Sequence, residues 1–378
     1  MVDHLTPPLA TIPPDLRTLA DYERRAPAHL PAEVWAHIQD AAGTGLSARD
    51  NRAAFDRWRL MPRALADLAG GTTALELFEE RHATPVMVAP LAYGRIAHPD
   101  GERAIVRAAT AIGVGCILST LSSVTLEEVA AAREAARAQI GSDAPLWFQL
   151  YLQPRREDSL ALVRRAEAAD YRAIVLTIDA GVKPSGFVLP PGLEAANLQG
   201  MPRPRHVAAP GGRIVFGTPL ADAAPGWDDL AWLRAATTLP ILVKGMFAAE
   251  DARRMAGMGA DGLILSNHGG RVLDGLPAAL DQLPAILAAV GDTPVLVDGG
   301  VRCGTDVVKA LCLGARAVLV GRPVLHALAV AGLPGVAHVL HLLRTETETA
   351  MAQLGCPTLG DLTPARLVQP NRTVAPSG

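Results

Sequence analysis

Eight short apolar runs that alternate with eight helical segments predict an α/β protein, a (β/α)8 TIM barrel. The runs are rich in Val, Ile and Leu without strict alternation, which is typical of strands covered on both faces of a parallel sheet. They lie at residues 85–90, 115–120, 146–151, 173–179, 240–245, 262–267, 294–300 and 317–322. The helical segments lie at residues 100–113, 125–139, 157–169, 228–236, 248–258, 277–290, 304–313 and 335–353.

A doubly wound open sheet is the competing fold for alternating strands and helices. In its dinucleotide-binding form it carries a GxGxxG sequence after its first strand, where the glycines let the backbone approach a pyrophosphate. Here the first strand ends in APLAYG, without that pattern. The barrel is therefore favoured.

The segments outside the repeated units complete the expected organisation. Residues 1–83 are expected to form an N-terminal helical segment that packs on the barrel, because apolar residues recur at helical spacing between residues 16 and 62. Residues 84–356 are assigned to the barrel, and the tail at 357–378 is expected to be irregular. The long loop after strand four, residues 180–227, is typical of an active-site lid or a disordered segment, and we favour the lid.

Composition indicates a globular protein of the cytoplasm. The chain has 35 Lys and Arg against 38 Asp and Glu, a formal net charge of −3, so no basic field favours nucleic acid or an anionic membrane surface. Hydrophobic residues make up 49% and charged residues 19%, which excludes a disordered chain. The four cysteines show no CxxC pair or metal-ligand spacing, so no metal is expected. No apolar run reaches the roughly 18 residues of a membrane span.

Polar side chains follow successive predicted strands, at the end where barrel enzymes carry their chemistry. One such residue would be explained by a structural salt bridge, whereas polar groups at six successive strand ends indicate a site. These polar groups and their glycine neighbour are Gln149, Tyr151, Thr177, Asp179, Lys244, Ser266, Asn267, His268, Asp298, Gly321 and Arg322.

Two motifs in this set suggest specific chemistry. DGG followed by Arg302, with GR at the next strand end, predicts a phosphate site, because glycine amides approach an anion closely and arginine binds it with two N–H groups. After strand six, His268 offers a proton acceptor and Arg271 a carboxylate-binding group. Asp179 could orient the imidazole, and Lys244 could stabilise negative charge on a reduced cofactor ring.

Six segments carry a resemblance to a known family: APLAYGRIAHPDGE, STLSSVTLEEVA, WFQLY, LVKGM, SNHGGRVLDGLPAALDQLP and DGGVRCGTDVVKALCLGARAVLVGRP. Together they resemble the FMN-dependent α-hydroxy-acid oxidising family, which includes glycolate and lactate oxidases, mandelate dehydrogenases and flavocytochrome lactate dehydrogenases. The resemblance extends from about Leu30 to His326. It implies FMN at the strand ends and oxidation of a 2-hydroxy acid to a 2-oxo acid. A histidine takes the hydroxyl proton as hydride moves to flavin N5, or removes the α-hydrogen in a carbanion route.

The resemblance also implies roles for individual residues. The catalytic set is His268 as base, Asp179 as its partner, Lys244 and Tyr151. The substrate-binding set is Arg271 and Tyr151, to which His37 and Lys183 are added as candidates at the positions where the chain departs from the family. The cofactor-binding set is Ala89, Pro90, Leu91, Ala92, Ser119, Gln149, Thr177, Lys244, Ser266, Asp298, Gly300, Arg302, Gly321 and Arg322. A homotetramer is expected on the same basis, with oxygen or a separate redox partner as electron acceptor.

The chain departs from the family at two of the three usual contacts to the substrate carboxylate. After Asp179 it lacks several residues and an arginine, for which Lys183 or a lid arginine (Arg203, Arg205, Arg213) could substitute. His37 stands where the family usually has a tyrosine, although a surface position on a helix explains it equally well. The alternatives are therefore the same chemistry on a larger, conjugated or neutral α-hydroxy substrate, or a non-catalytic FMN-binding scaffold. The retained catalytic set argues against the scaffold.

Overall fold

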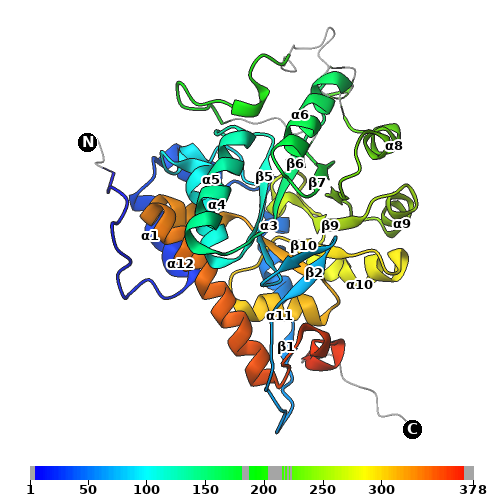
Figure 1. Cartoon of the computed structure of the whole chain (residues 1–378). Coiled ribbons are helices and arrows are strands. Elements are labelled where there is room, and N and C mark those ends of the chain that lie inside the picture. Colours follow the sequence, from blue (N-terminus) through cyan, green and yellow to red (C-terminus); the bar gives the residue numbers. More distant parts are fainter. Residues whose placement is uncertain are drawn as a thin grey trace.

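The structure, a computed structural model, describes residues 5–180, 187–202 and 224–369, together with 215, 216, 218 and 221. At its centre is a closed barrel of eight parallel strands in the spatial order β10-β11-β4-β5-β6-β7-β8-β9 (Figure 1). In chain order the strands are β4 (Val86–Val88), β5 (Gly115–Ser119), β6 (Leu146–Leu150), β7 (Ile174–Thr177), β8 (Ile241–Lys244), β9 (Gly262–Ser266), β10 (Val295–Asp298) and β11 (Ala317–Val320). All eight predicted strands are confirmed.

Helices follow the strands and surround the barrel (Figure 1). They are α4 (Gly101–Ile112), α5 (Leu126–Ile140), α6 (Arg156–Ala168), α8 (Trp227–Ala236), α9 (Ala249–Gly257), α10 (Ala279–Val290), α11 (Gly304–Cys312) and α12 (Arg322–Leu354). Short 3₁₀ helices are η1 (Ala26–Ala28), η2 (Gly94–Ile96), η3 (Ala196–Leu198), η4 (His268–Gly270), η5 (Leu359–Asp361) and η6 (Pro364–Arg366).

The last helix, α12, differs from the sequence expectation. It begins at Arg322 directly after β11, not at residue 335, and kinks where Ala331 and Gly332 leave helical geometry. Gly332 and Pro334 interrupt the helical pattern in the sequence, which hid the first part of the helix. In the described part of the chain α12 is the one helix long and apolar enough to cross a membrane, but 78% of its apolar window is buried inside the protein, as in a core helix.

A hairpin closes the amino-terminal end of the barrel. Its strands are β2 (Leu75–Leu77) and β3 (Glu80–His82), and Leu75 and Leu77 pack with the side chains that fill the barrel interior. The indole nitrogen of Trp147, at the barrel centre, donates to Glu80 Oε2 at 3.1 Å. The expectation that residues 1–83 are helical is therefore wrong for this part, because two strands this short leave little periodicity in the sequence.

The N-terminal helices lie against the barrel. They are α1 (Leu19–Arg25), α2 (Ala32–Gln39) and α3 (Leu46–Asp56). Thr18 and Asp21 form a capping box at the start of α1. A second correction concerns the chain after α3, where β1 (Arg59–Leu60) pairs antiparallel with β12 (Leu367–Val368), so the tail that was expected to be irregular contains a strand. Pairing between such distant segments leaves no local signal.

Two glycines allow α3 to approach the carboxyl ends of the barrel strands. Gly270 has φ +76°, and a Cβ there would lie 2.5 Å from the amide nitrogen of Ala48. Gly300 has φ +84°, and a Cβ there would lie 2.1 Å from the carbonyl oxygen of Asn51. Only glycine fits a position that combines this conformation with such a contact. The backbone of α3 therefore touches the loops after β9 and β10.

Polar contacts fix α3 in this position. The side chains of Asn51 and Asn267 exchange two hydrogen bonds, at 2.7 and 2.9 Å. Asp274 accepts from the amides of Ser47 at 2.9 Å and Thr44 at 2.8 Å, and these bonds lower the pKa of its carboxyl to about 2. These contacts join α3 to the chain on both sides of η4.

We predict that Gly270→Ala lowers the free energy of unfolding by about 3 kcal/mol, because a Cβ adds both left-handed strain and a backbone clash. Gly275 is the matched control: its φ is +84°, but nothing lies within 4 Å of the position of a Cβ. Gly275→Ala should cost only about 1 kcal/mol. Urea unfolding followed by circular dichroism measures both, and equal losses would contradict the close packing of α3.

Candidate active site

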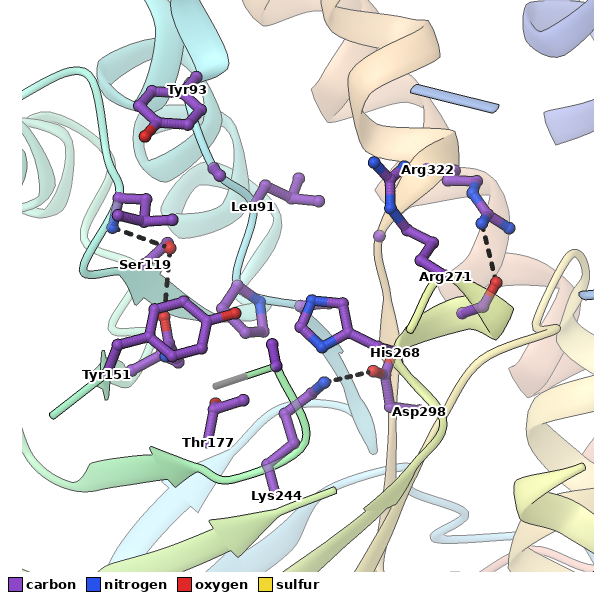
Figure 2. Close-up of a pocket in the computed structure, with 18 of the residues that line it drawn as sticks. Leu91, Tyr93, Ser119, Tyr151, Thr177, Lys244, His268, Arg271, Asp298 and Arg322 are labelled. Atoms are coloured by element: carbon purple, nitrogen blue, oxygen red, sulfur yellow. Dashed lines mark hydrogen bonds and ion pairs between the residues drawn. The ribbon is translucent and has the colours of Figure 1, made fainter. Parts of the chain in front are cut away.

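A cavity of about 570 Å³ opens at the carboxyl ends of the barrel strands. Figure 2 shows residues that line it. The predicted site residues within the described chain line the cavity, with the exception of Asp179, Ser266 and Asn267. Lys183, Arg203, Arg205 and Arg213 lie outside the described residues. The sequence therefore located one site, built from strand ends that are far apart in the chain.

His268 and Asp179 form a hydrogen-bonded pair at the edge of this cavity. The imidazole Nδ1 lies 2.9 Å from Asp179 Oδ1, so Nδ1 carries the donated proton and Nε2 is left as an acceptor. Burial acts to raise the pKa of Asp179, but the charge and hydrogen bond of His268, with the charge of Lys244, hold it below its ordinary value. Gly245, at φ +106°, makes room for this carboxylate, because a Cβ there would lie 2.6 Å from Asp179 Cβ.

Lys244 is a buried cation that keeps its proton. Its Nζ lies 3.0 Å from Asp298 Oδ2 and 3.0 Å from Ser266 Oγ. Burial acts to lower the pKa of Lys244, but the negative charges of Asp298 and Asp179 raise it above the ordinary value. A fixed positive charge therefore lies at the end of β8, where it can stabilise negative charge on a bound ring.

Ser266 has a different place from the one expected. It is fully buried and does not line the cavity, so its assignment as a cofactor-binding residue is not supported by its position. Its hydroxyl donates to Asp298 Oδ2 at 2.8 Å and accepts from the amide of His268 at 3.0 Å. Ser266 thus forms hydrogen bonds with three groups of the cavity wall without lining the cavity itself: Lys244, Asp298 and the backbone of His268.

Two buried polar atoms in the cavity wall have no partner among the described residues: Gln149 Nε2 and Thr177 Oγ1. The other amide atom of that glutamine, Oε1, accepts from Ser119 Oγ at 3.1 Å, which fixes the orientation of the amide. A buried polar group without a partner costs about 1–3 kcal/mol. A flat ring with nitrogen and carbonyl edges would satisfy both atoms.

Three arginines lie along the opposite part of the cavity: Arg271, Arg302 and Arg322. Burial lowers the pKa of each, and for Arg322 the positive charges of the other two lower it further. Arg322 donates to the carbonyl oxygens of Ile38, Asp40 and Gly269, and Arg271 to those of His37 and Ile38. Arg271 and Arg302 also lie 3.8 Å from the carboxylates of Asp40 and Glu23, but two carboxylates do not balance three buried cations, so this part of the cavity is suited to anions.

His37 lies at the cavity and not on a free helix surface. Its ring stacks on the ring of Phe187 with centroids 4.0 Å apart and an angle of 15° between the planes. Tyr151 enters from the other side, and Figure 2 shows Tyr151 and His268 reaching toward the same space. Burial and the charge of Asp179 raise the pKa of Tyr151, so its hydroxyl keeps its proton and can donate.

Several residues that line the cavity on the side of the long loop were not among the predicted site residues. Tyr93, held at φ +53°, lines the cavity at the end of the first barrel strand and follows directly after the predicted Ala92. The others are mainly apolar: Leu121, Leu152, Pro154, Phe187, Leu189, Leu198 and Pro225. An apolar side chain in a cavity wall has the same sequence pattern as one in the core, so no signal could have identified these residues.

Comparison with known proteins agrees with this geometry. A family described as FMN-dependent dehydrogenase matches residues 26–369. The L-lactate oxidase of Alicycliphilus denitrificans is 48% identical over 364 residues, which cover 94% of this chain and 97% of that protein. The 4-hydroxymandelate oxidase of Amycolatopsis orientalis is 44% identical over 352 residues, covering 91% and 96%.

The solved structure of a mandelate oxidase with (S)-2-phenylpropionate is also similar, with a TM-score of 0.81 and 43% identity over 93% of this chain and 98% of that one. The family match covers α2, α3, the barrel and the residues that line the cavity. The chain therefore belongs to the FMN-dependent dehydrogenase family, and it is a flavoenzyme that uses FMN to oxidise a 2-hydroxy acid to a 2-oxo acid.

Proposed function

We propose that His268 is the base of this oxidation and that Arg271 binds the substrate carboxylate. FMN, when bound, accepts the two electrons that leave the α-carbon. The main support for this proposal is the 2.9 Å hydrogen bond between His268 Nδ1 and Asp179 Oδ1, which leaves Nε2 free to take the hydroxyl proton of the substrate. The imidazolium that forms is then stabilised by a carboxylate that is already ionised. A carbanion route would use the same nitrogen to remove the α-hydrogen.

The described residues fit FMN. Gln149 Nε2 and Thr177 Oγ1, both buried without a partner, would bind the polar edge of the flavin ring, and Lys244 would place its charge beside that edge. The phosphate would be held where Arg302 and Arg322 meet the glycine loops after β10 and β11. Asp298 would bind the ribityl chain. Ser119 and the 89–92 backbone would complete the ring site.

A second candidate function concerns the substrate. In the described chain, Arg271 is the one arginine that lines the cavity between His268 and His37 and is not assigned to the phosphate, and the neighbouring wall is largely apolar. A carboxylate held by a single arginine is less well neutralised than one held by two. This arrangement favours, as the alternative, a larger or conjugated α-hydroxy substrate whose remaining parts contribute to binding.

Three further properties are part of the proposal. Oxygen is the proposed electron acceptor, because the most similar relatives reported above are named oxidases. A homotetramer and a cytoplasmic location are proposed on the family resemblance. Oxygen consumption and sedimentation velocity of the purified protein address acceptor and assembly.

Anaerobic mixing with a panel of hydroxy acids tests the base assignment. Wild-type protein should lose its visible flavin absorbance, whereas His268→Ala should keep FMN and lower the reduction rate by about 10²–10⁴-fold. His341, an exposed histidine of α12, gives the control His341→Ala, which should reduce normally. Loss of flavin absorbance with small hydroxy acids supports the leading function. Loss of absorbance only with larger compounds supports the alternative, a larger or conjugated substrate. No bleaching by any would indicate a scaffold.

Asp179→Asn should lower kcat/KM by about 10³–10⁴-fold with FMN retained, since an amide no longer holds the correct tautomer. The folded pKa of Asp179 is below its ordinary value, so its ionised form stabilises the protein above about pH 4, and this contribution is lost as pH falls through the folded pKa. The part of the difference in unfolding free energy between wild type and variant that comes from ionised Asp179 should therefore shrink as the pH falls below about 4. A difference that grows as the pH falls below about 4 would contradict the pairing.

Arg322→Met should weaken FMN binding by about 10–100-fold, because a charge-assisted contact to the phosphate is lost. Titration of deflavinated protein, followed by quenching of FMN fluorescence, measures the dissociation constant. Arg316 is exposed at the opposite end of β11, so Arg316→Met is the control and should bind FMN as the wild type does. Unchanged affinity in Arg322→Met would place the phosphate elsewhere.

A further inference from the structure

Part of the long connection after β7 is docked firmly on the barrel. The segment around η3 (Ala196–Leu198) lies on the loop between β5 and α5, where the amide of Ala196 donates to the carbonyl oxygen of Ser122 at 2.9 Å. The side chain of Asn197 is turned inward and only 1% of this residue is exposed. The next residue, Leu198, lines the cavity.

Asn197 binds a group that would otherwise lack a partner. Its Oδ1 accepts from the amide of Leu126 at 2.8 Å, and Leu126 is the first residue of α5. The first amides of a helix have no partner within the helix. The Nδ2 of Asn197 also lies 3.5 Å from the carbonyl oxygen of Thr120. One buried side chain thus joins the long connection to the two ends of the β5–α5 loop.

The backbone of Asn197 is held from a second direction. Arg165 of α6 donates to its carbonyl oxygen at 3.0 Å and is itself held by Glu127 of α5, with Nε 2.8 Å from Oε1. Contacts from α5, α6 and the β5–α5 loop therefore meet at this one residue. Leu198 follows directly, so its side chain is fixed in the cavity wall by its neighbour.

The wall that includes Leu198 is apolar. Leu121, Leu152, Pro154, Phe187 and Leu189 line the same cavity, and no charged residue of the described segment 187–202 does so. A charged group placed against such a wall would lose its hydration without gaining a partner, whereas an apolar group would gain by leaving water.

We propose that Asn197 is a positioning residue that fixes Leu198 as one wall of the substrate side-chain site, and that the enzyme consequently prefers 2-hydroxy acids with apolar side chains. The inference rests on the proposed function, in which the carboxylate lies at Arg271 and the hydroxyl at His268. It extends that function by assigning the side chain to the wall beside η3.

The test compares three substrates in anaerobic stopped-flow reduction: glycolate without a side chain, mandelate with an apolar one, and malate with a charged one. The flavin of the wild-type enzyme should be reduced fastest by mandelate when the three substrates are compared at equal concentration. In Asn197→Ala the ratio of kcat/KM for mandelate over glycolate should fall by about tenfold. The loss should lie mainly in the dissociation constant for mandelate. Gln199→Ala, in the same segment but exposed, is the control and should keep the wild-type ratio.

Thermal unfolding and FMN content separate this role from general destabilisation. Leu198→Ala removes the side chain that forms the wall and keeps the contacts of Asn197. It should therefore lower the ratio of kcat/KM for mandelate over glycolate even if Asn197→Ala fails to fold. Preference of the wild type for malate, or equal losses for all substrates in both variants, would overturn the inference and leave the proposed function intact. If no hydroxy acid reduces the wild-type flavin, the proposed function fails and this inference fails with it.

Discussion

The site depends on the contact between α3 and the two glycines, Gly270 and Gly300, at the strand ends. At these points the backbones are too close for a side chain. The loop after β9 carries His268 and Arg271, and the loop after β10 carries the predicted phosphate site. The carbonyl groups at the end of α2 accept from Arg271 and Arg322. The N-terminal segment is thus part of the active site and not a separate addition to the barrel.

The unbalanced cations of the cavity and its paired charges lie in different parts of the cavity. Arg271, Arg302 and Arg322 lie along one part, where burial lowers the pKa of each and only two carboxylates, those of Asp40 and Glu23, lie near the three cations. Toward the ends of β7 and β8 the charges are paired, because Asp179 faces the imidazole and Lys244 lies against Asp298. One part is therefore suited to bind the anionic groups of cofactor and substrate. The other provides the base and a fixed positive charge beside the reacting centre.

The sequence predicted what depends on repetition and missed what depends on distant contacts. Eight buried strands and the polar residues after them recur with a period that a single chain displays. The β2–β3 hairpin and the pairing of β1 with β12 have strands of two or three residues, too short for periodicity. Ser266 was assigned to the cofactor on the family resemblance, yet it is fully buried and binds Lys244 and Asp298 without lining the cavity itself. The orientation of one side chain is set by its neighbours in space, which the sequence does not show.

The pairing of β1 with β12 has a consequence for the order of folding. Strand β1 begins three positions after α3 ends, and its partner lies at residues 367–368, so this contact spans nearly the whole described chain. Contacts of such sequence separation form late, because a long stretch of chain must first be ordered. On a ribosome, the barrel strands emerge before β12, the strand that pairs with β1 after α3. The chain that leaves α3 is therefore paired with its partner strand only after all eight barrel strands have been made.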